Sequence, residues 1–121
     1  MDYLLVGIGG MFGSIARYKL GKYVSQRSKS GFPLGTFFIN VTGALLLGIL
    51  TGLQTFETIY TLLGDGFLGA YTTFSTFMYE GFNLFQDREK LNAFIYILGS
   101  LILGILGFAV GVQIGILLKK I

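Results

Sequence analysis

The sequence has no cysteine and no histidine, so it lacks the side chains that most often act as thiolate nucleophile, general base and transition-metal ligand. Zinc, haem and iron–sulfur sites are therefore excluded, and no disulfide can form. Tryptophan is absent as well, and proline occurs once. Only 12% of the 121 residues are charged, which is too little polar surface for an ordinary soluble domain of this size.

Apolar residues dominate what remains: hydrophobic side chains make up 53% of the chain, and the mean hydropathy is +0.72. Four apolar stretches lie at residues 3–24, 34–53, 59–85 and 91–118. Each approaches or exceeds the roughly 20 residues with which a helix crosses a bilayer core. The connections are short, so consecutive helices are antiparallel neighbours. The sequence thus predicts an all-α membrane protein, with a single four-helix transmembrane domain over residues 1–121 in a lipid bilayer.

The basic residues are divided unevenly between the two sides of this predicted bundle. Seven of the nine belong to one side, namely Arg17, Lys19, Lys22, Arg27, Lys29, Arg88 and Lys90. The other side has only Lys119 and Lys120. The positive-inside rule then places both termini outside. The net charge of +3 is interpreted as a signal of membrane orientation, and no nucleic-acid partner is predicted.

Small residues recur at helical spacing in two of the stretches. The fourth stretch has Gly104, Gly107, Gly111 and Gly115, and the second has Ala44, Gly48 and Gly52. Small side chains let two helix backbones approach each other in lipid, so both rows are interpreted as helix–helix packing faces.

A run of hydroxyl residues interrupts the third stretch. Residues 71–77 read Tyr-Thr-Thr-Phe-Ser-Thr-Phe and follow Gly64, Gly66 and Gly69. Hydroxyl side chains compete for backbone hydrogen bonds, so the third helix is predicted to break near residues 69–77, with carbonyl oxygens free to hold a cation. The alternative is a continuous helix in which the hydroxyls bond to their own backbone.

Neutral donors and aromatic edges accompany this run. The hydroxyls and the amide of Asn40 carry no fixed charge, which suits an anion that must bind and also leave. Phe74 and Phe77 are three residues apart on one helical face, and the edge of an aromatic ring is its positive part. The alternative for each phenylalanine is ordinary contact with lipid or core.

Three stretches of sequence resemble the signatures of the Fluc (CrcB) family of fluoride channels. They are residues 9–18 (GGMFGSIARY), residues 33–43 (PLGTFFINVTG) and residues 66–77 (GFLGAYTTFSTF), the last followed by Glu80. The resemblance implies an antiparallel, dual-topology dimer of four-helix subunits with a broken third helix. It also implies two fluoride pores, each built from both chains, that give passive fluoride efflux across a bacterial or other microbial plasma membrane.

The resemblance also implies roles for individual residues. Phe74 and Phe77 would line the pores with their ring edges, Asn40 would donate its amide, and Ser75 and Thr76 would supply hydroxyls. Arg17 would shape the aqueous vestibule, and Tyr96 and Ser100 would be polar residues on the pore side of the fourth helix. The backbone carbonyls of Gly69 and Thr72 would hold a structural sodium ion, Na⁺, at the centre of the dimer.

Two features bear on the partner and on the ion path. The uneven basic charge favours one orientation, so the partner is either an inverted second copy or an oppositely biased paralogous subunit. Asp65 stands directly before the third signature, where it is interpreted as an interfacial residue. The sequence has no P-loop motif, and we expect neither energy coupling nor enzymatic activity.

Two other interpretations remain open. A small four-helix, proton-coupled multidrug exporter would need a carboxylate within the membrane, and Glu80 is the best candidate for it. A purely structural or hole-forming membrane protein would use the glycine rows alone, but it leaves Asn40 and the hydroxyl run unexplained.

Overall fold

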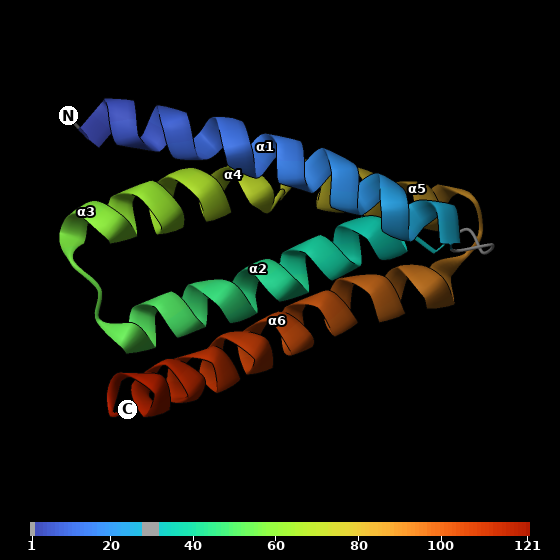
Figure 1. Ribbon diagram of the computed structural model, residues 1–121. Coiled ribbons are helices and arrows are strands. Elements are labelled where there is room, and N and C mark those ends of the chain that lie inside the picture. The colour runs from blue at the N-terminus through green and yellow to red at the C-terminus, as the bar shows by residue number, and fades with distance from the viewer. Residues whose placement is uncertain (1, 28–31) are drawn as a thin grey trace.

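The computed structural model describes residues 2–27 and 32–121, and every regular element among them is a helix (Figure 1). The elements are α1 (Asp2–Arg27), α2 (Leu34–Leu53), α3 (Glu57–Ile59), η1 (Tyr60–Leu68), α4 (Gly69–Tyr71), α5 (Ser75–Gln86) and α6 (Lys90–Lys119). The short helices α3, η1, α4 and α5 follow one another in the region predicted as the third apolar stretch. Lys29, one of the basic residues assigned to one side of the bundle, lies outside the described residues.

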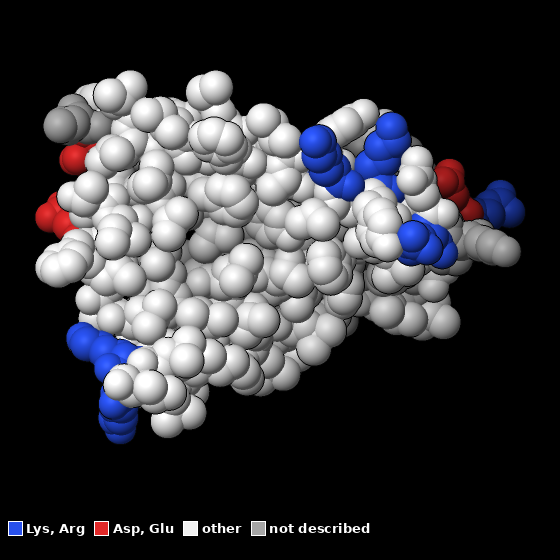
Figure 2. All heavy atoms as spheres, in the orientation of Figure 1, with Lys and Arg blue, Asp and Glu red and all other residues white. Residues whose placement is uncertain are grey.

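The long elements run antiparallel to one another in the order of the chain (Figure 1). Helix α1 lies along η1 and α4, while α2 lies along α6. Both termini are found at the same end of the molecule, as four consecutive antiparallel segments require. Basic side chains gather at the opposite end, where α1 ends and α6 begins (Figure 2).

Among the described residues, two helices are long and apolar enough to cross a membrane by length and composition. They are α2 and α6, in which a window of 18 residues has a mean hydropathy of 1.8 and 2.5, respectively. Helix α1 is long enough, but its glycines and basic residues lower its mean hydropathy. The third stretch is interrupted at Thr72, where the helix ends.

Helices α2 and α6 meet along a glycine seam, which consists of Gly48 and Gly52 on α2 and Gly111 and Gly115 on α6. A Cβ atom at any of the four would overlap a carbonyl oxygen of the facing helix. Only glycine allows the backbones to come this close. Gly104 belongs to the same predicted row, yet a Cβ atom there would have no neighbour within 4 Å. The close backbone approach that requires glycine is therefore found at Gly111 and Gly115 and not at Gly104.

Helix α1 contacts η1 through a second close approach. A Cβ at Gly9 would overlap the carbonyl oxygen of Leu62, and a Cβ at Gly13 would overlap that of Phe67. These carbonyls are five residues apart, whereas the glycines are four apart. The difference arises because η1 is a π-helix of 9 residues, in which hydrogen bonds join residues five apart. One π-helical turn of η1 is thus matched to one α-helical turn of α1.

Two small apolar clusters lie on either side of the interrupted segment. Ile39, Leu68 and Tyr71 form the first cluster. Leu84, Ala93 and Tyr96 form the second, against which the ring of Phe77 packs. The chain before the interruption is therefore anchored to α2, and the chain after it is anchored to α6.

Candidate ion site at the helix break

The backbone leaves helical geometry between α4 and α5. Helix α4 ends at Tyr71, Thr72 is extended with φ −81° and ψ 158°, and α5 begins at Ser75. Both the amide N–H and the hydroxyl of Thr72 still donate to the carbonyl oxygen of Leu68, each at 3.0 Å. Thr72 therefore closes the first helix, and the next two residues form the interruption.

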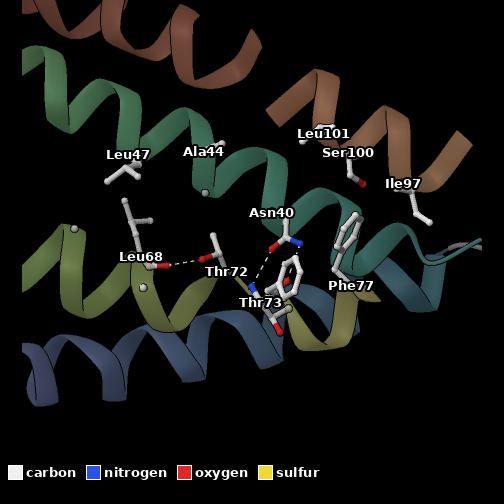
Figure 3. A pocket seen from close by; sticks show the side chains of 14 residues that line it. Asn40, Ala44, Leu47, Leu68, Thr72, Thr73, Phe77, Ile97, Ser100 and Leu101 are labelled. Atoms are coloured by element: carbon white, nitrogen blue, oxygen red, sulfur yellow. Dashed lines mark hydrogen bonds between the residues drawn. The ribbon is translucent and has the colours of Figure 1, made fainter. Parts of the chain in front are cut away.

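Asn40 holds the interrupted backbone from the neighbouring helix α2. Its Nδ2 donates to the carbonyl oxygen of Thr73 at 2.9 Å, and its Oδ1 accepts from the N–H of Thr73 at 2.9 Å (Figure 3). The orientation of the amide is fixed, because the N–H of Thr73 requires an oxygen opposite it. An amide nitrogen carries two hydrogens, so one donor of Asn40 remains available to a ligand.

The clamp and the hydroxyl of Thr73 together release two backbone carbonyls. In a continuous helix the N–H of Thr73 would donate to the carbonyl of Gly69, but here it donates to Asn40. The N–H of Thr76 would similarly donate to the carbonyl of Thr72, but it donates to the Thr73 hydroxyl at 3.3 Å. The carbonyl oxygens of Gly69 and Thr72 thereby lose their helical donors and become available as ligands.

A groove of about 530 Å³ opens beside the clamp (Figure 3). Its polar lining consists of Asn40, Thr72, Thr73 and Ser100, and no charged side chain lines it. The remaining lining is glycine, aliphatic and aromatic. The hydroxyl oxygen of Ser100 is buried, and among the described residues no group forms a hydrogen bond with it. The lining of the groove thus includes a hydroxyl on α6 without a partner among the described residues and an amide on α2 with one hydrogen unused.

Phe74 and Phe77 line the same groove from the break and from α5. Their ring centroids are 6.3 Å apart, with an angle of 48° between the ring planes. Phe77 is fixed by the buried ring of Tyr96, with the two centroids 5.1 Å apart. Phe74 is 75% exposed. One ring therefore belongs to the core of the subunit, and the other projects from it.

Glu80 lies on α5 one turn beyond Phe77, and it is engaged by α2. The hydroxyl of Thr36 donates to its Oε1 at 2.5 Å. The hydroxyl of Tyr96 on α6 is buried, and no described residue forms a hydrogen bond with it. Glu80 does not line the groove.

Comparison with known proteins identifies the relatives of this fold. Residues 4–112 match the family model described as CrcB-like protein, Camphor Resistance (CrcB). The chain belongs to the CrcB-like family. It is 65% identical over 111 residues to fluoride-specific ion channel FluC 2 of Clostridium acetobutylicum, which covers 92% of this chain and 95% of the relative. It is 44% identical to fluoride-specific ion channel FluC 2 of Bacillus cereus, with 95% of this chain and 98% of the relative covered.

Membership of this channel family makes the chain an all-α membrane protein and not an enzyme. The resemblance seen in the three sequence signatures is therefore confirmed. The exposed apolar side chains on the outer faces of α1 and α6 have lipid as their natural surroundings.

The CrcB-like fold brings together part of the predicted site. Six of the residues assigned from the sequence line the groove: Asn40, Gly69, Thr72, Phe74, Phe77 and Ser100. Four others do not line it. Tyr96 lies behind the ring of Phe77, Ser75 and Thr76 begin α5 with exposed side chains, and Arg17 is half-buried on α1.

Two threonines that form hydrogen bonds at the break or near it were given no role from the sequence. Thr73 receives the clamp through its backbone, and Thr36 holds Glu80. Thr36 stands four residues before Asn40, just as Tyr96 stands four before Ser100. This spacing places each pair on one helix face. The four-residue spacing from Asn40 is thus the sequence feature that could have indicated Thr36.

Proposed function

We propose that this chain is a fluoride-selective channel through which fluoride crosses the plasma membrane passively. The names of the relatives support this function, and no relative described above carries the name of an exporter. The observation that carries the proposal is the groove at the break, which is lined by Asn40, with one amide hydrogen unused, by Ser100 and by no charged side chain.

The chemistry of this groove suits a small, strongly hydrated anion. Moving such an ion into an apolar space costs tens of kcal/mol on a simple Born estimate unless other donors replace its water. The Asn40 amide, the Ser100 hydroxyl and the positive edges of Phe74 and Phe77 are donors of that kind. Because none carries a fixed charge, the anion is bound without being trapped.

A second copy completes the site in this proposal. The groove is open, and Phe74 is 75% exposed in a position that lines it. An inverted copy that covers the groove supplies the missing wall, and its own groove is covered in return, which gives two pores. The exposed Ser75 and Thr76 hydroxyls at the start of α5 then border the interface between the copies.

Four membrane-spanning segments per subunit belong to this proposal, with the third formed by α3, η1, α4 and α5. The common end of both termini supports an even number of crossings. Reporters fused at Ile121 test the orientation. An inverted homodimer predicts signals on both sides of the membrane. A signal on one side only, in cells without a paralogous subunit, would reject it.

A sodium ion fits the released carbonyls. Sodium is a hard cation that prefers oxygen ligands, and the carbonyls of Gly69 and Thr72 are oxygens without helical donors. Two carbonyls from each copy would hold the ion between the subunits. When bound, it supplies a fixed positive charge close to the pores.

Growth of bacteria that lack their own fluoride exit route tests the function. Fluoride enters cells as neutral HF and is trapped as the anion, so a passive exit is sufficient. We expect expression of the chain to restore growth on fluoride. We expect fluoride export by Glu80→Gln, like that by the wild type, to be independent of the proton gradient. Failure of a well-expressed chain to restore growth would reject the channel. Transport that depends on a proton gradient and is lost in Glu80→Gln would favour the exporter instead.

A further inference from the structure

One exposed face of α1 changes its character along the helix axis. The first four turns expose the apolar side chains of Leu4, Ile8, Met11, Phe12 and Ile15. Two exposed tyrosines, Tyr18 and Tyr23, follow. The exposed cations Lys19, Lys22 and Arg27 surround and follow these tyrosines. At about 100° per residue, all of these positions lie within about half of the helix circumference.

The tyrosine rings hold two of the cations in place. The ammonium group of Lys22 lies 5.8 Å from the ring centroid of Tyr18, and the guanidinium of Arg27 lies 4.3 Å from that of Tyr23. Over residues 2–27 and 32–121, the side-chain contacts of these two cations are with rings and not with carboxylates. Both cations are exposed, and Figure 2 shows that basic side chains gather at this end of the molecule.

We propose that this face of α1 binds an anionic phospholipid, with an acyl chain along the apolar side chains and the headgroup phosphate between Lys19, Lys22 and Arg27. A phospholipid has an apolar chain, an interfacial region and a charged phosphate in the order in which α1 exposes apolar, aromatic and cationic residues. A nucleic acid or an acidic peptide would match the cations but would leave the apolar half of the face uncovered. The proposal does not depend on fluoride conduction.

The absence of tryptophan makes a direct test possible, because a single introduced tryptophan is the only such fluorophore. The reporter is Tyr18→Trp, which keeps an aromatic ring beside Lys22. The purified full chain is placed in vesicles of two parts phosphatidylcholine to one part phosphatidylglycerol, with bromine on the acyl chains of one lipid or the other. We expect brominated phosphatidylglycerol to quench the tryptophan fluorescence. Its apparent affinity should exceed that of brominated phosphatidylcholine by about threefold or more.

Charge variants and a second reporter complete the test. Lys19→Gln/Lys22→Gln/Arg27→Gln is expected to bring the ratio of the two affinities to one, while Lys19→Arg/Lys22→Arg keeps the preference and serves as the control for folding. Reporter Ile105→Trp, at a position on α6 that is 62% exposed, is expected to show no preference. Added salt is expected to weaken the preference, and inorganic phosphate to weaken it no more than chloride at equal ionic strength.

Three results would overturn the proposal. The first is equal quenching by the two lipids at Tyr18→Trp. The second is a preference that survives replacement of the three cations by glutamine. The third is quenching that follows the protein-to-lipid ratio rather than the lipid type, because it would mean that another protein copy covers this face of α1.

Discussion

The glycine seam and the break both bring two segments of backbone close together, but they treat backbone hydrogen bonds in opposite ways. At the seam, helices α2 and α6 remain continuous, and glycine hydrogens cover the facing carbonyl oxygens. At the break, the N–H groups of Thr73 and Thr76 donate to side-chain oxygens. Carbonyls are satisfied within the helices at the seam and released at the break.

This difference assigns stability to one region and ion chemistry to the other. A seam of satisfied backbones has no group left for a ligand, whereas the break has two released carbonyls and one spare amide hydrogen. Substitutions at the seam are therefore expected to affect folding, and substitutions at the break are expected to affect transport.

The largest effect is expected at Gly111 in the seam. A Cβ there would overlap the carbonyl oxygen of Leu45 and lie 2.9 Å from the backbone nitrogen of Ile49, so Gly111→Ala forces the two helices apart. Overpacking of this kind costs about 1–3 kcal/mol or more. The measurement is unfolding in a detergent titration. Gly104→Ala on the same helix is the matched control, since its Cβ has no neighbour within 4 Å. We expect that control to be neutral or stabilising by up to about 1 kcal/mol. Equal destabilisation by both substitutions would contradict the role of the glycine seam in packing α2 against α6.

Asn40→Asp tests the break without removing the clamp oxygen. The carboxylate still accepts from the N–H of Thr73, but it cannot donate to the carbonyl of Thr73 or to an anion. Loss of a donor and repulsion of the anion together correspond to about a hundredfold loss of fluoride flux. Fluoride efflux from vesicles measures it, and Asn92→Asp, outside the groove, is the control. A flux within twofold of the wild-type value would remove Asn40 from the ion path.

The two phenylalanines separate conduction from stability. Phe74→Ile and Phe77→Ile both remove a ring edge from the groove, and we expect each to lower fluoride flux about tenfold with the dimer intact. Only Phe77 packs against the buried Tyr96, so only Phe77→Ile is also expected to destabilise the subunit, by about 1–3 kcal/mol. Flux and unfolding are measured on the same preparations. Unchanged fluoride flux in both variants would rule out a contribution of the ring edges to conduction.

The smallest effect is expected at the Thr73 hydroxyl. Thr73→Val removes the oxygen that accepts from the N–H of Thr76, so this N–H can return to the carbonyl of Thr72. We expect the sodium concentration for half-maximal fluoride flux to rise about threefold, with flux at high sodium unchanged. Thr72→Val is the control, because the backbone N–H of Thr72 also bonds to Leu68 and keeps α4 closed. The same sodium dependence in both variants and the wild type would contradict the role of the released carbonyls.

Much of this arrangement was visible in the sequence because it depends on local pattern. The second apolar stretch, 34–53, has the same bounds as α2, and the hydroxyl run contains the residues at which α4 ends and α5 begins. The Asn40–Thr73 clamp was not predicted, since it joins residues 33 apart in the chain. The π-helix η1, which sets the spacing of its contacts with the glycines of α1, was not predicted either. Gly104 shows the same limit, because helical spacing alone did not reveal which glycines of the row on α6 make the close approach to α2.

The most direct test is anion efflux from vesicles that contain the purified wild-type chain. Valinomycin and a potassium gradient set the membrane voltage, and fluoride and chloride are measured in parallel under the same conditions. We predict rapid fluoride efflux with chloride efflux no greater than that of empty vesicles. Equal efflux of the two anions, or no efflux of either, would contradict a fluoride-selective path at the helix break.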